Sequence, residues 1–226
     1  MKFAIMQPGS FALLKVNLEA GETVKAESDA MMSMTSNITL ESKMEGGLLG
    51  GLARSFLSGE SMFFQTLTAK NGAGEVVLAP AIPGDIEAYH LDGRTTLYIQ
   101  SGGFLAAEPG VEINTKMQHL GKGLFSGAGL FVIKVGGTGT VFFNTFGAIY
   151  TQTLAPGEEF IVDTGHLVAW EESMDYKVQK AASGLMNSLT SGECLVCRFT
   201  GPGKVYMQSR NPGSFGSWVR SCIPAK

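Results

Sequence analysis

Apolar and polar residues alternate along many short stretches of this chain, and glycine-rich turns separate the stretches. Phe64, Thr66 and Thr68 recur with a period of two before one such turn, and Val76 and Leu78 do so after it. A period of two is typical of a β-strand whose two faces meet different surroundings. Turn signals recur about every 8–12 residues, and such spacing is typical of sandwiches and barrels. The sequence therefore predicts an all-β fold.

Helical patterns are few. The two candidates are short stretches at Leu48–Leu57 and Ala181–Leu189. Glycines at 46, 47, 50 and 51 accompany the first, and each weakens a helix by about 1 kcal/mol relative to alanine. We expect a loop there, with at most one helical turn.

A G-x-G pattern between two apolar stretches occurs three times, about 65 residues apart. The copies are TAKNGAGEVVLA with Gly72 and Gly74, IKVGGTGTVFFN with Gly137 and Gly139, and CRFTGPGKVYMQ with Gly201 and Gly203. Two strands joined by a short glycine turn are typical of a β-hairpin. The pattern predicts one hairpin in each copy.

Two further turn signals recur in the same order. One is Ser58-Gly59-Glu60, Ser126-Gly127-Ala128 and Ser191-Gly192-Glu193; the other is Ala20-Gly21-Glu22, Pro83-Gly84-Asp85 and Pro156-Gly157-Glu158. The interval from Gly84 to Gly157 is the longest, and an insertion near residues 89–95 would explain it. Three recurring signals indicate a triplicated unit. We predict β repeats over residues 1–88, 89–156 and 157–226.

The composition limits the classes of function that we expect for this chain. Apolar residues make up 44% of the 226 residues and charged residues 16%, which favours surface buried between subunits. The net charge of −3 and the scattered Lys and Arg give no basic stripe, so we expect no nucleic-acid partner. We also expect no signal peptide and no membrane-spanning helix. Three cysteines do not form a disulfide framework, and reduced thiols favour a bacterial cytoplasm.

Candidate catalytic or metal-binding residues are isolated. Cys194 and Cys197 form a C-x-x-C within an apolar strand, where residues three apart point to opposite faces, so we expect buried structural thiols. His90, His119 and His166 form no H-x-H pair. The chain also lacks a Walker loop and a G-x-S-x-G elbow. We therefore expect no enzyme activity, no cofactor and no metal.

Three segments carry a family resemblance. They are GGLLGGLARSFLSGESMFFQTLTAKNGAGEVVLAPAIPGDIEAYHL (46–91), LYIQSGGFLAAEP (97–109) and IVDTGHLVAWEES (161–173). The chain resembles the altered-inheritance-of-mitochondria (mitochondrial biogenesis) proteins, a family without an established molecular function. The resemblance implies three tandem TRAP-like repeats (TRAP is the tryptophan RNA-binding attenuation protein), of the double-stranded β-helix or sandwich kind. It implies a ring-like trimer of nine repeats. The RNA-binding role does not carry over, because no matching basic positions occur.

The loops before the G-x-G segments are glycine-rich and apolar: KMEGGLLGGLARSFLSGE, QHLGKGLFSGAG and KAASGLMNSLTSGE. Under threefold pseudosymmetry they would emerge on one face and form an apolar interface; alternatively, they fold back over the local core. The candidate interaction residues are Leu48, Leu49, Arg54, Phe56, Gly59 and Glu60. Arg54 would pair with Glu60 or with an acid of another subunit, and Gly59 would meet a backbone requirement.

Three hypotheses follow. The first is a non-catalytic structural or assembly protein that forms a homotrimer and presents these loops to a protein partner or a membrane surface. The alternative is a small-molecule binding module with sites between repeats or subunits, for which Trp170, Tyr98 and Phe104 are candidate wall residues or, as readily, core residues. An enzyme with a metal or thiol centre is the third.

Overall fold

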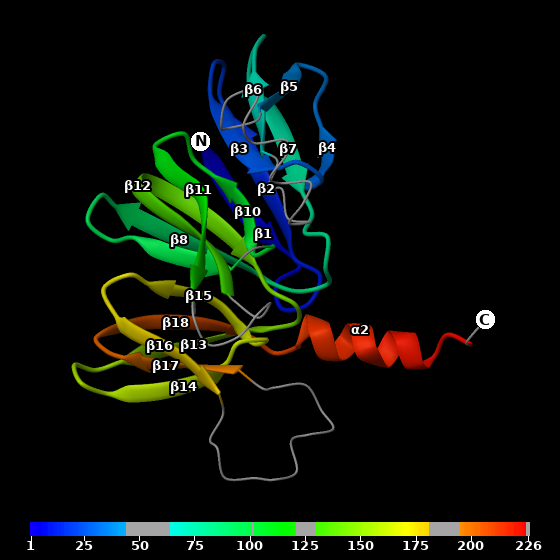
Figure 1. Cartoon of the computed structure of the whole chain (residues 1–226). Helices are drawn as coiled ribbons and strands as arrows, with labels where there is room; N and C mark the ends of the chain where they lie inside the picture. Colours follow the sequence, from blue (N-terminus) through cyan, green and yellow to red (C-terminus); the bar gives the residue numbers. More distant parts are fainter. Residues whose placement is uncertain (44–63, 101, 121–129, 181–194, 225–226) are drawn as a thin grey trace.

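The computed structural model describes residues 1–43, 64–100, 102–120, 130–180 and 195–224. It consists of strands that pair antiparallel in three sheets, with one helix near the C-terminus (Figure 1). This confirms the all-β prediction. The strands form three successive groups after an initial β1 (Lys2–Met6).

The first group is β2 (Leu13–Leu18), β3 (Thr23–Glu27), β4 (Met31–Met34), β5 (Ile38–Lys43), β6 (Phe64–Ala69) and β7 (Gly74–Leu78). The second group is β8 (Ile86–Asp92), β9 (Leu97–Gln100), β10 (Phe104–Ala107), β11 (Val111–Leu120) and β12 (Leu130–Asn144). The third group is β13 (Ile149–Leu154), β14 (Glu159–Asp163), β15 (Leu167–Glu171), β16 (Asp175–Lys180), β17 (Leu195–Thr200) and β18 (Gly203–Gln208).

One pairing scheme recurs in the three groups. The first and third strands flank the sixth, and the second and fourth strands flank the fifth. In the second group the long β12 acts as both fifth and sixth strand, because its first half pairs with β9 and β11 and its second half with β8 and β10. Each third strand skips one residue at the same place, at Met32, Leu105 and Val168. The recurring bulge fixes the alignment of the groups.

Neighbouring groups join through a second kind of pairing. The third strand of each later group pairs with the second strand of the group before it, as β10 with β3 and β15 with β9. Apolar residues of each later group also belong to the core around the group before it. The core around the first group includes Leu105 and Phe142 of the second, and the core around the second includes Val168 and Tyr206 of the third. The groups therefore pack against one another as one body.

The G-x-G segments are not hairpins, and this corrects the prediction from sequence. Among the described strands β6 pairs with β3 and β5, whereas β7 pairs with β2 and β4. In the third group β17 and β18 likewise have no pairing with each other. In the first and third groups the glycine segment carries the chain from one sheet to another, whereas in the second group it lies inside the continuous strand β12. A glycine signal does not specify which strand edges meet.

A side chain at the end of the third strand holds each crossover. It accepts a hydrogen bond from the backbone N–H that follows the second glycine of the G-x-G. The donor–acceptor pairs are Glu75 N to Thr35 Oγ1 (3.1 Å), Thr140 N to Glu108 Oε2 (2.6 Å) and Lys204 N to Glu171 Oε2 (3.2 Å). Gly139 and Gly203 have φ of 128° and 153°, a region that favours glycine. The G-x-G pattern thus marks a crossover with a recurring polar contact.

The turn signal assigned to Gly84 also needs correction. Gly21 and Gly157 turn the chain between the first and second strands of their groups, with φ of 86° and 78°. The matching turn of the second group lies at Gly93, with φ of 83°. Gly84 lies instead in the connection between the first two groups, where it forms a bridge with Gly147. With Gly93 as the counterpart, the predicted insertion in the second copy is unnecessary.

The helix α2 (Pro212–Ser221) was missed from sequence. Its start carries ordinary signals, because Asn211 caps it through a bond from Ser214 N (3.1 Å) and Pro212 opens it. The two helix candidates named from sequence lie outside the described residues. Among the residues the structure describes, no helix is long and apolar enough to span a bilayer.

Candidate functional site

The interaction loop that the sequence singled out lies outside the described part of the chain. Leu48, Leu49, Arg54, Phe56, Gly59 and Glu60 all fall within residues 44–63. The corresponding loops at 121–129 and 181–194 are outside it as well. Their role stays a prediction, and the candidate sites below are built from the described residues.

Several strands pair with a single described neighbour, and two of them are of the kinds that join the groups at the internal junctions. The third strand of the first group, β4, pairs with β7 alone, and the second strand of the third group, β14, pairs with β17 alone. At the internal junctions these two kinds of strand pair with each other. Figure 1 shows β4 and β14 at opposite ends of the molecule, so they do not meet within one chain. An open edge of this kind is a surface for pairing with another chain.

Met34, at the end of β4, is 39% exposed. It pairs with Val76, two residues after the second glycine of its G-x-G. Trp170 has the same place in the third group, since it pairs with Val205. Trp170 is fully buried. Met34 is therefore an exposed apolar side chain at a position that is buried where a junction is complete.

Ile161, on β14, is 49% exposed. It pairs with Arg198, three residues before the first glycine of its G-x-G, as Tyr98 pairs with Lys134 in the second group. Tyr98 is buried at the internal junction, where it lies opposite Trp170 with the two rings 5.4 Å apart. The exposed Met34 and Ile161 thus correspond to the two halves of a buried contact pair.

Polar contacts reinforce the internal junction. The hydroxyl of Tyr98 and the ammonium of Lys134 both donate to Glu172 Oε1. Lys134 holds the pKa of Glu172 below its ordinary value. Burial, and then the bond to Glu172, raises the pKa of Tyr98 to about 12. The tyrosine therefore stays protonated at neutral pH, and the cluster serves to join two groups.

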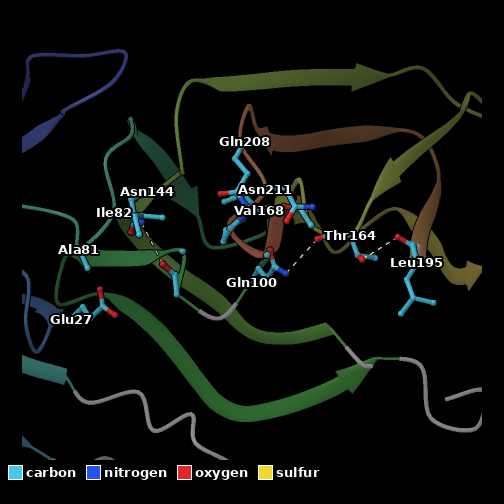
Figure 2. A pocket seen from close by; sticks show the side chains of 15 residues that line it. Glu27, Ala81, Ile82, Gln100, Asn144, Thr164, Val168, Leu195, Gln208 and Asn211 are labelled. Carbon is cyan, nitrogen blue, oxygen red and sulfur yellow. Dashed lines mark hydrogen bonds between the residues drawn. The ribbon is translucent and has the colours of Figure 1, made fainter. Parts of the chain in front are cut away.

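A cavity of about 620 Å³ lies where the connections between groups come together (Figure 2). Residues of all three groups and the start of α2 line it. The apolar wall includes Ile82, Val168 and Leu195, and the polar wall includes Gln100 and Asn144. A mainly apolar cavity with a few polar groups has the ordinary character of a small-molecule site.

The polar groups of the cavity differ in their hydrogen bonding. The Gln208 amide donates to Gly165 O (3.0 Å) and accepts from Phe146 N (2.9 Å), so its needs are met. Asn144 donates to Gly102 O at 3.4 Å, but its Oδ1 is buried without a partner among the described atoms. Leaving a buried acceptor unpaired costs about 1–3 kcal/mol. This unpaired acceptor belongs to a residue that lines the cavity, but the oxygen itself is closed off from solvent.

Glu27 supplies a carboxyl to the same cavity. Burial, and then the nearby charge of Asp29, raises its pKa above the ordinary 4.5.

Glu27→Gln should raise the melting temperature at pH 7.5 by a few degrees, because ionised Glu27 destabilises the fold above its raised pKa. The penalty is absent below the unfolded value, so the gain should vanish at pH 4. Thermal unfolding by circular dichroism checks this. The exposed Glu19→Gln is the control variant, and an equal gain from Glu27→Gln at both pH values would contradict the assignment.

Within the described ranges, the thiol of Cys197 and the imidazole of His166 are held in ways that bear on their chemistry. Cys197 is fully buried with a free thiol whose pKa is raised by burial to about 12, which disfavours the nucleophilic thiolate. Cys194 lies outside these ranges. His166 Nδ1 lies 2.8 Å from Gln208 O and so is engaged by the backbone. No group of three or more His, Cys, Asp and Glu side chains within these ranges could hold a metal ion.

The candidate wall residues named from sequence are core residues. Trp170 and Phe104 are fully buried, and Tyr98 is nearly so. None of them lines the cavity. The residues at the open edges, Met34 and Ile161, were not found from sequence, because their interest depends on which strand edges remain unpaired. Alternation alone gives no sign of that.

Comparison with known proteins agrees with this fold. The family model of the mitochondrial biogenesis AIM24 proteins matches residues 3–210. The uncharacterized protein M6_Spy0233 of Streptococcus pyogenes serotype M6 is 36% identical over 99% of this chain and 92% of its own length. The crystal structure of protein SPYM3_0169 from Streptococcus pyogenes is similar with a TM-score of 0.80 and 35% identity, over 98% of this chain and 99% of that one. The chain belongs to the mitochondrial biogenesis AIM24 family.

Proposed function

We propose that this protein is a non-catalytic assembly protein whose copies join head to tail into a ring-like homotrimer. The observation that supports the proposal is the pair of open edges: each end of the chain carries one half of the junction that occurs twice inside it. A chain with complementary halves at opposite ends adds further copies until a ring closes. Closure leaves neither edge open.

The internal junctions specify a register for the contact between copies. Trp170 lies opposite Tyr98 at the complete junction, flanked by the pair Ala169 and Ile99. By correspondence, Met34 of one copy would lie opposite Ile161 of the next. Burying two apolar side chains that are partly exposed in the single chain contributes favourably at about 25 cal/mol per Å² of apolar surface.

The proposal extends to the architecture of the ring. The recurring pairing scheme and bulge support three tandem TRAP-like repeats, each made of one strand group. Three chains would then form a ring of nine. The loops at 44–63, 121–129 and 181–194 all follow the fourth strand of their groups, so a ring would present them to a protein partner or a membrane surface. The free thiols of Cys197 and Cys222 fit a cytoplasmic location.

A charge at either open edge should separate the copies. Met34→Lys and Ile161→Lys would each bury an unpaired ammonium at the contact, so each variant should elute as a monomer where the unchanged protein elutes at three times the 23.9 kDa chain mass. Size-exclusion chromatography with light scattering at micromolar concentration measures this. Tyr150→Lys is the matched control, since Tyr150 is exposed on β13, a first strand, and first strands do not pair at the internal junctions. A monomeric unchanged protein, or variants that remain trimeric, would overturn the proposal.

The cavity supports a second candidate function, a small-molecule binding module. Its mainly apolar wall, which includes Asn144 as a polar residue, favours a compact organic ligand. Native mass spectrometry of protein purified without denaturant should then show an added mass, which Asn144→Leu should remove while the fold is retained. The absence of any added mass, together with no thermal shift across a metabolite panel, would contradict this function.

A further inference from the structure

The helix α2 carries an apolar stripe along its length. Phe215, Trp218, Val219 and Cys222 recur at spacings of three and four, which places them on one face, and Ile223 continues the stripe. Arg220 and Ser217 lie on the opposite face. No residue of α2 is buried, and Trp218 is 62% exposed. Figure 1 shows the helix projecting away from the strands. An apolar stripe of this size on an exposed helix marks a contact surface.

The contact of α2 with its own chain lies near the start of the helix. The ring of Phe215 packs edge-on against Phe146 at 5.2 Å, and Phe215 also contacts Trp218 at 5.8 Å. The far end, with Ile223 63% exposed, extends beyond the strand groups. The helix is thus anchored at one end and presents the rest of its stripe outward.

The position of α2 follows from how the connections between groups are stacked. Ala12 N donates to Gly84 O at 2.9 Å, Asp85 N to Gly147 O at 3.1 Å, and Ser209 N to Ala148 O at 3.0 Å. The segment before the first group, the two internal connections and the segment after the third group therefore lie side by side in chain order. After residues 147–148 the chain continues into a new first strand, whereas after 209–210 it continues into α2. The helix therefore leaves the stack where a following group would begin.

The segment before the first group carries a complementary surface. Phe11 is 73% exposed, the most exposed large apolar side chain in the described ranges. It borders a groove of about 240 Å³ whose lining is apolar, with Leu13, Pro80, Ile82 and Pro83 among its residues. The groove is large enough for one aromatic side chain. In a head-to-tail assembly the next copy would bring this segment to the place where α2 departs.

We propose that the apolar stripe of α2 docks on a second copy of this chain, in the groove beside Phe11. This inference rests on the proposed head-to-tail assembly and adds a second contact to the paired edges of β4 and β14. The helix then acts as a clasp from the third group of one copy to the first group of the next. Trp218 and Ile223, which are exposed in the single chain, would be covered.

Disulfide trapping tests the clasp separately from the paired edges. The clasp variant carries Phe11→Cys and Cys194→Ser, so that the introduced thiol and the native exposed Cys222 are the reactive pair while Cys197 stays buried. Mild oxidation should link copies into dimers and trimers on a non-reducing gel. The edge variant carries Met34→Cys, Ile161→Cys, Cys194→Ser and Cys222→Ser. Links in the edge variant without links in the clasp variant would overturn the clasp and leave the assembly standing; links in neither would overturn both.

Two further measurements serve as controls for this test. Cys194→Ser alone should give no links; dimers there would mean that helices meet each other through Cys222, and would overturn docking beside Phe11. In sedimentation experiments Trp218→Ser should weaken trimer formation at least tenfold, with the melting temperature of the monomer unchanged. Arg220→Gln, on the opposite face, should leave assembly unchanged. Equal assembly of both variants would also overturn the clasp.

Discussion

Trp170→Ala should lower the free energy of unfolding by about 3–5 kcal/mol. Trp170 is fully buried in the core of the third group, with its ring 5.4 Å from those of Tyr98 and Tyr176 and 5.6 Å from that of Phe199. The alanine would leave a cavity between the second and third groups, because Tyr98 belongs to the neighbouring group. Urea unfolding followed by circular dichroism measures the loss.

Trp170→Phe is the matched control. The indole Nε1 is buried without a partner among the described atoms, so phenylalanine removes an unpaired donor while it keeps an aromatic ring. We expect this change to cost less than about 1.5 kcal/mol, since the relief of the unpaired donor offsets part of the lost volume. A Trp170→Ala variant as stable as Trp170→Phe would show that the aromatic cluster does not hold the junction together.

Gly84→Ala should destabilise the protein by about 3 kcal/mol or more, at or above the upper range for overpacked sites. A Cβ on Gly84 would lie 1.6 Å from the carbonyl oxygen of Thr145 and 3.0 Å from Gly147 N. Both are backbone atoms, which cannot rotate away as the end of a side chain can. The two connections would have to separate, and the bond from Asp85 N to Gly147 O would be strained. Thermal and urea unfolding both measure this.

Gly216→Ala provides the contrast, because Gly216 lies inside α2 with open space around its Cβ position. Alanine is favoured over glycine in a helix by up to about 1 kcal/mol, so this change should stabilise the helix slightly. If Gly84→Ala unfolds at the same urea concentration as the unchanged protein, the close stacking of the connections is not a feature of the folded state.

Part of the fold was accessible from sequence because it depends on local chemistry. Alternation predicted strands such as β6, where buried and less buried residues alternate from Gln65 to Ala69. Positive-φ glycines such as Gly21 predicted turns that the structure contains. The landmark at Gly84 failed because a glycine can serve either to turn the chain or to allow close approach of two backbones. These uses look alike in sequence.

The candidate sites were not accessible from sequence for a related reason. The interest of Met34 and Ile161 comes from the absence of a neighbouring strand among those described, and that of the cavity from the meeting of three groups distant in sequence. The helix α2 could have been found from its Asn-Pro start and its three- and four-residue apolar spacing. The exposure of its apolar face could not have been predicted from sequence.

The sequence by itself determined that this chain forms β-strands separated by glycine turns in a recurring order, because strand periodicity and backbone freedom are properties of neighbouring residues. Tertiary structure alone decided that the residues before and after each G-x-G pair with different strands and that the groups join third strand to second. It also decided that β4 and β14 each keep open the edge that the corresponding strands use at the internal junctions. Pairing depends on which edges and cores meet in space, and residues far apart in the chain settle that through packing.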